Sequence, residues 1–136
     1  MKNEVIFPLS VILIITLGIL TSCTKDEEQI KKWIVGTWNI DRYEQQNFNN
    51  GQLTGESEST DQGMIEFKSD GTGHDIGGNF IGGEFTWTNT DKTLSLTSGG
   101  GLTVYDIEEY SDNAFVFSIT DIKGDNKDVE RWYLSK

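Results

Sequence analysis

The chain has only one cysteine, one proline and one histidine among its 136 residues. A single cysteine cannot form a disulfide within the chain, so stability must come from apolar packing and from sheet hydrogen bonds. A zinc site needs three or four His or Cys ligands, and the chain cannot supply them. The one proline, Pro8, lies near the start, so no proline interrupts the strands expected further along.

Basic residues are also few, because 11 Lys and Arg stand against 22 Asp and Glu, which gives a formal net charge of −11. Proteins that bind nucleic acids need a basic face that neutralises phosphates. Proteins that dock on anionic lipid headgroups need basic clusters as well. The composition therefore argues against a nucleic acid partner and against docking of that kind.

One long apolar run occupies residues 5–20, near the start. It is shorter than the roughly 20 residues that span a bilayer, and Pro8, Ser10, Thr16 and Gly18 interrupt it. A short start containing Lys2, an apolar stretch and small residues before a cut are typical of a signal peptide. We therefore expect residues 1–22 to be a signal peptide, which leaves 114 residues, a length that suits one domain.

The run ends in Leu20-Thr21-Ser22-Cys23, which resembles the lipobox of bacterial lipoproteins. The resemblance implies that the Cys23 thiol receives a diacylglycerol, that the signal is cut before Cys23, and that the new amine is acylated. More than one acyl chain anchors a protein stably. An ordinary secretory signal with an incidental cysteine is the alternative.

The segment that follows, Lys25-Asp26-Glu27-Glu28, resembles the export signal of Bacteroidetes-type lipoproteins. This resemblance implies transport to the outer membrane and exposure at the cell surface. We expect residues 23–30 to form an acidic tether after the lipidated cysteine. The alternative to an export signal is that this tether is only a solvated, charged segment, which any lipoprotein could carry.

From residue 36 onward, short runs rich in β-branched and aromatic residues alternate with Gly, Asn, Asp and Ser, which predicts an all-β domain. A helical turn or two is expected over 29–35, and a long polar loop over 47–61. Eight strands are expected, at 36–46, 62–68, 72–77, 83–89, 93–97, 102–110, 114–120 and 128–134. Leu102 and Val104 lie on the face opposite Tyr105 and Ile107, so that strand has a bulge or two apolar sides.

Short connections make antiparallel neighbours of successive strands, and a meander of eight strands can close into an up-and-down barrel. Eight strands enclose an interior that side chains fill, or that holds one small ligand. An open sandwich is the alternative, because the sequence does not decide whether the first and last strands pair.

Gly36-Thr37-Trp38 at the start of the first strand resembles the Gly-x-Trp signature of lipocalins. Three further motifs resemble the small lipocalin-like domains of bacterial lipoproteins: Phe67-Lys68-Ser69-Asp70-Gly71, Phe85-Thr86-Trp87 and Trp132-Tyr133-Leu134-Ser135-Lys136. The resemblance implies a lipocalin-like β-barrel domain over residues 31–136. It also implies barrel closure at Gly36 and Trp38, with Arg131 lying across the indole.

Aromatic side chains are the candidate ligand-binding groups, and core packing is the alternative role for them. The candidates are Trp38, Phe67, Phe85, Trp87, Tyr105 and Phe117. We expect no enzyme and no cofactor, because nothing near His74 resembles a nucleophile turn and Glu108 and Glu109 point to opposite faces of a strand. No metal site is expected, although calcium at the acidic hairpin 121–128 stays open, with Lys123 and Lys127 opposing it.

These features together predict a surface-anchored lipoprotein of the outer membrane, held by its N-terminal lipid. Its lipocalin-like barrel would bind a small apolar or amphipathic ligand without catalysis. The alternative is a structural or protein-interaction module of the cell envelope with a filled barrel.

Overall fold

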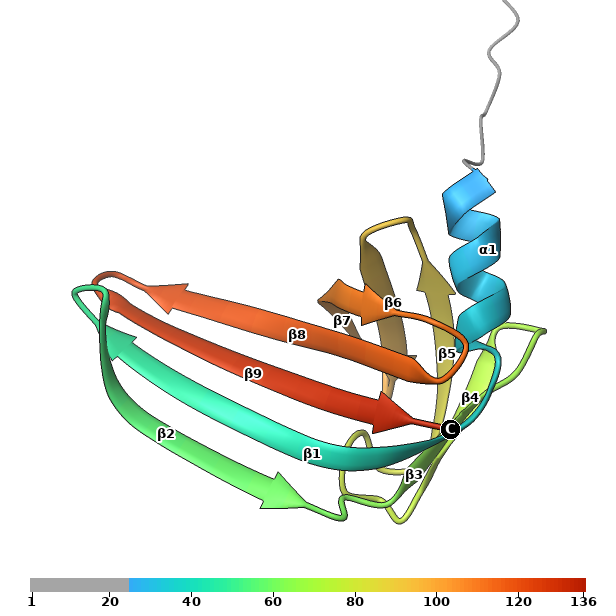
Figure 1. Ribbon diagram of the computed structural model, residues 1–136, viewed down its shortest axis with the longest axis horizontal. Helices are drawn as coiled ribbons and strands as arrows, with labels where there is room; N and C mark the ends of the chain where they lie inside the picture. Colours follow the sequence, from blue (N-terminus) through green and yellow to red (C-terminus); the bar gives the residue numbers. More distant parts are fainter. Residues whose placement is uncertain (1–24) are drawn as a thin grey trace, which may run out of the picture.

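The computed structural model describes residues 25–136, so the expected signal peptide and Cys23 lie outside the described residues. Figure 1 shows one helix beside a strongly curved sheet. The elements are α1 (Lys25–Ile34), β1 (Gly36–Asn49), β2 (Gln52–Thr60), β3 (Met64–Phe67), β4 (Thr72–Ile76), β5 (Glu84–Asn89), β6 (Thr93–Ser98), β7 (Gly101–Tyr110), β8 (Ala114–Lys123) and β9 (Asn126–Ser135).

The sheet is closed. From β3 to β9 each strand pairs antiparallel with the next, and β1 pairs with β3 along one edge and with β9 along the other. Eight strands, β1 and β3 to β9, therefore form an antiparallel barrel, as the sequence predicted. Because the first and last strands pair, the open sandwich is excluded.

The expected loop over 47–61 is wrong, because this segment completes a β-hairpin. Asn50 and Gly51 form the turn with φ angles of 48° and 77°, which suits a two-residue hairpin loop. β2 then pairs with β1 from Asn49↔Gln52 to Arg42↔Thr60. The strand was missed because nearly all its residues are polar and exposed, so it lacks the apolar alternation that marks a strand.

β2 and β3 lie one after the other along the same edge of β1, joined through residues 61–63. Beyond the barrel, β2, β1, β9 and β8 continue as a four-stranded extension, which we call the arm (residues 42–60 and 118–131). Figure 1 shows the arm reaching past the end of β7. β7 pairs with β8 only as far as Ser118, so the arm has one face toward the mouth of the barrel and one toward solvent.

α1 covers the opposite, closed end of the barrel. Acidic residues occupy its first turn and Lys31 and Lys32 its last turn, which complements the helix dipole. Its apolar side buries Ile30 and Ile34, and the Trp38 Nε1–H donates to the Ile34 carbonyl at 2.7 Å. The helix begins at Lys25, earlier than expected, so residues 25–30 of the expected tether are helical instead. No helix within residues 25–136 is long and apolar enough to cross a membrane.

Aromatic rings fill the barrel around Phe67. Its ring meets those of Phe85, Trp87 and Phe115 edge-on, with centroids 5.5, 5.4 and 6.4 Å apart. Such pairs stabilise beyond their area burial by about 0.5–1.5 kcal/mol each. In β7 a bulge lies between Ile107 and Glu109. Before the bulge, strand alternation turns Tyr105 inward and leaves Leu102 exposed on the other face.

The predicted contact between Arg131 and Trp38 is wrong. Arg131 lies opposite Glu44 and faces outward, with Nε 2.6 Å from Glu108 Oε2 and Nη1 3.3 Å from Glu44 Oε1. The reason is strand alternation: Trp132 points inward, so its neighbour Arg131 must point outward. Lys136 lies on the indole instead, with Nζ 4.3 Å from the ring centre of Trp38, beside the start of β1 at Gly36.

Candidate functional site

The loop between β4 and β5, residues 77–83, folds across the open end of the barrel. Its Phe80 ring contacts Trp132, Phe117 and Tyr105, with centroids 5.1, 5.6 and 5.9 Å apart. Phe80 itself is half-buried, so one side of the ring packs on the core and the other faces the mouth. The loop therefore places an aromatic plug at the point where the barrel opens.

The Asp75 carboxylate holds this loop in shape. Asp75 is 3% exposed, and its Oδ2 accepts hydrogen bonds from the backbone N–H groups of Phe80, Ile81 and Gly82 at 3.0, 2.7 and 2.9 Å. Its Oδ1 accepts a fourth from Gly78 at 3.3 Å. Hydrogen bonds to a charged acceptor are stronger than neutral ones, so one buried carboxylate organises the whole loop.

Two open hollows flank Phe80 beneath the inner face of the arm. One has a volume of about 360 Å³ and reaches toward Tyr43 and Ser59. The other has a volume of about 620 Å³ and reaches toward Tyr105 and Ile119. Both are lined by Phe80, Glu130 and Trp132, so we treat them together as the groove. Their size falls in the range of about 300–1,000 Å³ that is usual for small-molecule sites.

The floor of the groove is aromatic. Trp132 stacks on Phe117 with an interplanar angle of 21° and a centroid distance of 5.6 Å. The rings of Tyr43 and Tyr105 flank it, at centroid distances of 5.2 and 5.4 Å. Rings of this kind give a large apolar contact area with few rotatable bonds, which suits recognition of a flat or aliphatic ligand body.

A carboxylate stands beside these rings. Glu130 lies two residues before Trp132 on β9, so both side chains share the inner face. Burial, together with the negative charge of Glu130, raises the pKa of Tyr105 to about 12 and raises that of Tyr43 as well. Both phenols therefore stay protonated and neutral at physiological pH, and Glu130 is the negative group that faces them.

Further out, the inner face of the arm is polar, and several of its side chains hydrogen-bond or ion-pair with one another. Asn47 Nδ2 donates to Asp128 Oδ1 at 2.8 Å, and Lys123 pairs with Asp121. Within residues 25–136 no three His, Cys, Asp or Glu side chains converge as metal ligands. Of the acidic residues in the hairpin 121–128, Asp128 thus accepts from an amide and Asp121 pairs with a lysine.

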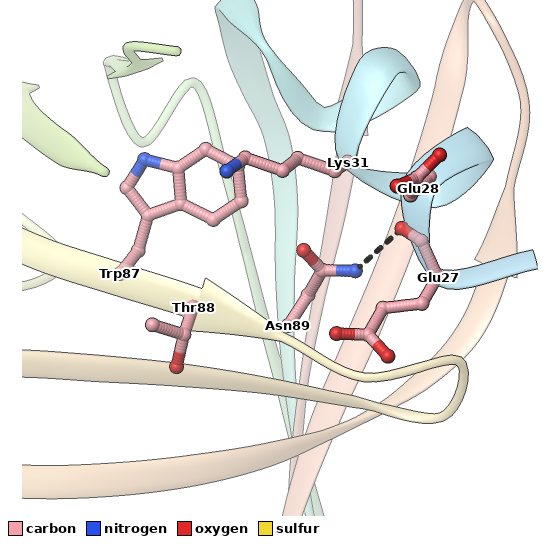
Figure 2. Close-up of a pocket in the computed structure, with 6 residues that line it drawn as sticks. All are labelled: Glu27, Glu28, Lys31, Trp87, Thr88 and Asn89. Carbon is pink, nitrogen blue, oxygen red and sulfur yellow. Dashed lines mark hydrogen bonds between the residues drawn. The ribbon is translucent and has the colours of Figure 1, made fainter. Parts of the chain in front are cut away.

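A smaller hollow of about 280 Å³ lies at the closed end, between α1 and the end of β5. Figure 2 shows Lys31 extended toward the Trp87 ring, with Nζ 6.0 Å from its centre, and Asn89 turned toward the Glu27 carbonyl, which it reaches at 3.1 Å. The Trp87 Nε1–H is already donated to the carbonyls of Lys68 and Thr72. The contacts of Lys31 with Trp87 and of Asn89 with Glu27 attach the helix to the barrel.

Of the six aromatic residues expected to bind ligand, the structure places only Tyr105 in the lining of the groove. Trp38, Phe67, Phe85 and Trp87 are at most 3% exposed in the core. Phe117 is buried directly beneath Phe80 and Trp132.

Sequence reasoning missed Tyr43, Phe80, Glu130 and Trp132 as groove residues. The available signal was Phe80, an aromatic residue set in a glycine-rich turn. His74 lies away from the groove on β4, with Nδ1 3.1 Å from Glu84 Oε1 on β5.

The family model of the lipocalin-like domain matches residues 34–117, from the end of α1 into β8. No curated protein matches the chain.

Proposed function

The chain belongs to the lipocalin-like domain family, and we propose that it binds a small apolar or amphipathic molecule, without catalysing a reaction, in the groove at the mouth of its barrel. One observation carries the proposal: the rings of Tyr43, Phe80 and Tyr105 border open hollows, whereas the rings deeper in the barrel pack against one another. An aromatic surface open to solvent at a concave site gains about 25 cal/mol per Å² when a ligand covers it.

Binding is tested by isothermal titration of the purified protein with dodecanol, below the concentration at which the alcohol aggregates. Phe80→Ala removes the wall shared by both hollows, so the affinity should fall. Tyr110→Ala serves as the control, because that ring is exposed on β7 against Trp33, away from the groove. Absence of binding by the parent, or an equal loss in both variants, would refute a binding role for the groove.

The lipid anchor at Cys23 is part of the same proposal. Cys23 lies two residues before Lys25, where α1 begins at the closed end of the barrel. An anchor there would hold the closed end toward the membrane and leave the groove facing away from it. Cys23→Ser should abolish incorporation of labelled palmitate; continued labelling of this variant would exclude the anchor.

Display at the surface of the outer membrane is proposed from Lys25 to Glu28, which form the first turn of α1. Replacing these four residues with Ala should retain the protein inside the envelope, while Lys32→Ala, on the exposed side of the same helix, should not. Protease added to intact cells reads out the difference. Equal digestion of both variants would contradict the export role.

A role as a protein-interaction module of the envelope is the second candidate, and one face favours it. On the outside of β5, β6 and β7, exposed Leu102 and Val104 lie opposite Thr97 and Ser95, and Thr86 and Thr88 continue the strip. The strip has no charge in a chain of net charge −11, and depletion of charge is typical of interface cores. Leu102→Glu with Val104→Glu should abolish cross-linking to an envelope protein while leaving dodecanol binding unchanged.

A further inference from the structure

We propose that the groove selects ligands that join an apolar body to a positively charged amine, with Glu130 as the countercharge for the amine. This inference rests on the proposed binding function and adds the chemical class of the ligand. Three features support it: the position of Glu130, the absence of a cation beside it among residues 25–136, and the charge of the surrounding wall.

Glu130 is placed where the head group of a bound molecule would lie. It borders both hollows, between the ring of Tyr43 on one side and that of Tyr105 on the other. An apolar body resting on Trp132 and Phe80 would bring a terminal group to this carboxylate. Aromatic faces also attract cations, so the rings and the carboxylate favour the same kind of head group.

Within the described part of the chain, no cation neutralises Glu130. The ion pairs among residues 25–136 all involve carboxylates other than Glu130. These are the carboxylates of Glu44, Glu58, Glu66, Glu84, Glu108 and Asp121. Arg131, its neighbour in sequence, points to the opposite face of the sheet. Lys123, the lysine that lines the groove, is paired with Asp121. A half-buried carboxylate without a cationic partner leaves a ligand amine free to form a charge-assisted hydrogen bond with it.

The same wall disfavours acids. Glu130, Asp128 and Asp121 follow one another along the inner face of the arm, with Lys123 as the only cation among the residues that line the larger hollow. The net charge of −11 further enriches cations near the surface and repels anions. A fatty acid of the same chain length would place its carboxylate against Glu130, so it should bind more weakly than the alcohol.

The test compares three ligands that differ only in the head group: dodecylamine, dodecanol and dodecanoate, each titrated calorimetrically into the purified protein below its aggregation concentration. We expect the amine to bind roughly tenfold more tightly than the alcohol, the equivalent of about 1.4 kcal/mol for one charge-assisted contact. The preference should shrink as salt rises, because screening weakens the charge pair.

Variants assign the effect to Glu130. Glu130→Gln should remove the preference for the amine over dodecanol, and Glu130→Lys should shift the preference to dodecanoate. Glu109→Gln, an exposed carboxylate on β7, removes the same charge outside the groove and should keep the preference. Thermal unfolding of each variant verifies that it is folded.

The outcomes separate the two proposals. If the parent binds amine and alcohol equally, or if Glu130→Gln keeps the preference, the charge inference is overturned while binding in the groove stands. If none of the three ligands binds the parent, the proposed function itself fails.

Discussion

The Lys136 ammonium lies 4.3 Å from the centre of the Trp38 indole and donates to the carbonyls of Trp33 and Val35 at 3.0 and 3.2 Å. Lys136, the residue that follows β9, therefore contacts both the start of β1 and the end of α1. Since Trp38 also donates to Ile34, the helix, the first strand and the last strand meet around a single ring.

The first prediction concerns this contact. In a double-mutant cycle, Trp38→Leu and Lys136→Met should be non-additive, because each removes one partner of the same cation–π contact. The expected coupling is about 0.5–2 kcal/mol, and Met keeps the apolar stem of the lysine so that the cycle reports on the ammonium. Urea unfolding measures all four proteins.

Arg131→Met is the matched control for that cycle. Arg131 lies opposite Glu44, well along β1 from Trp38, so its effect should add to that of Trp38→Leu. A coupling of zero for Lys136, or an equal coupling for Arg131, would mean that the closed end is built differently.

The second prediction concerns the approach of Phe85 to the backbone of β4. Gly73 is opposite Phe85, and a Cβ at Gly73 would collide with the Phe85 ring and the Glu66 carbonyl. Gly73→Ala should therefore lower the free energy of unfolding by roughly 1–3 kcal/mol, as overpacking does.

Gly101→Ala is the control for Gly73, since Gly101 also lies in a strand but its nearest neighbour, the Ser98 carbonyl, is 3.6 Å from the Cβ position. Its effect should stay within about 0.5 kcal/mol. Similar losses in both variants would show that the cost comes from replacing a glycine in a strand, and not from a collision with the Phe85 ring.

The barrel could be predicted because its strands carry a local signal. Pairs such as Ile65 with Phe67 and Leu94 with Leu96 alternate with polar residues, and burial of one face imposes that pattern. β2 carries no such signal, because it pairs only with β1 at the edge of the arm and neither of its faces is buried. Local pattern therefore identified the barrel strands, and it failed for β2 and for the far ends of β1, β8 and β9 in the arm.

The groove was harder to predict for a related reason. Composition identified the aromatic residues as candidates, but whether a ring fills the core or borders a hollow depends on distant elements. Phe67 is central because rings from β5 and β8 surround it, and Tyr43 borders the groove because β1 continues past the barrel. Register decided the closing cation as well, selecting Lys136 over Arg131.

The third prediction is a pH dependence at Glu108. Partial burial opposes its charged form, but hydrogen bonds from Arg131 and Ser118 and the charge of Arg131 outweigh burial and hold the pKa of Glu108 below its usual value. A lowered folded-state pKa stabilises the fold above the unfolded value of about 4.3, and this contribution is lost as the pH falls through the folded value.

Glu108→Gln should therefore be less stable than the parent at pH 7, and the gap should close near pH 3. The gap should not exceed about 1 kcal/mol, because the side chain is 35% exposed and solvent screens the pair. Urea unfolding at both pH values measures it, with the exposed Glu109→Gln as control. A gap of the same size at both pH values would show that the charge of Glu108 is not its source.

The last prediction returns to the loop that carries Phe80. Asp75→Asn replaces one carboxylate oxygen with an amide NH₂ group and removes the charge. If the remaining oxygen keeps the three N–H groups of Phe80, Ile81 and Gly82, the new NH₂ faces the Gly78 N–H, donor against donor. The free energy of unfolding should fall by about 2–3 kcal/mol, because buried donors lose a charged acceptor.

Hydrogen exchange distinguishes a loosened loop from a general loss of stability. In Asp75→Asn the amides of residues 80–82 should exchange faster by a larger factor than those of β8 and β9, since the loop can open while the barrel stays closed. Asp70→Asn is the control, because Asp70 caps an exposed turn at Thr72 and does not touch the loop. Uniform acceleration across the sheet in Asp75→Asn would show that Asp75 supports the barrel as a whole, and the rings at its mouth would then owe their position to core packing alone.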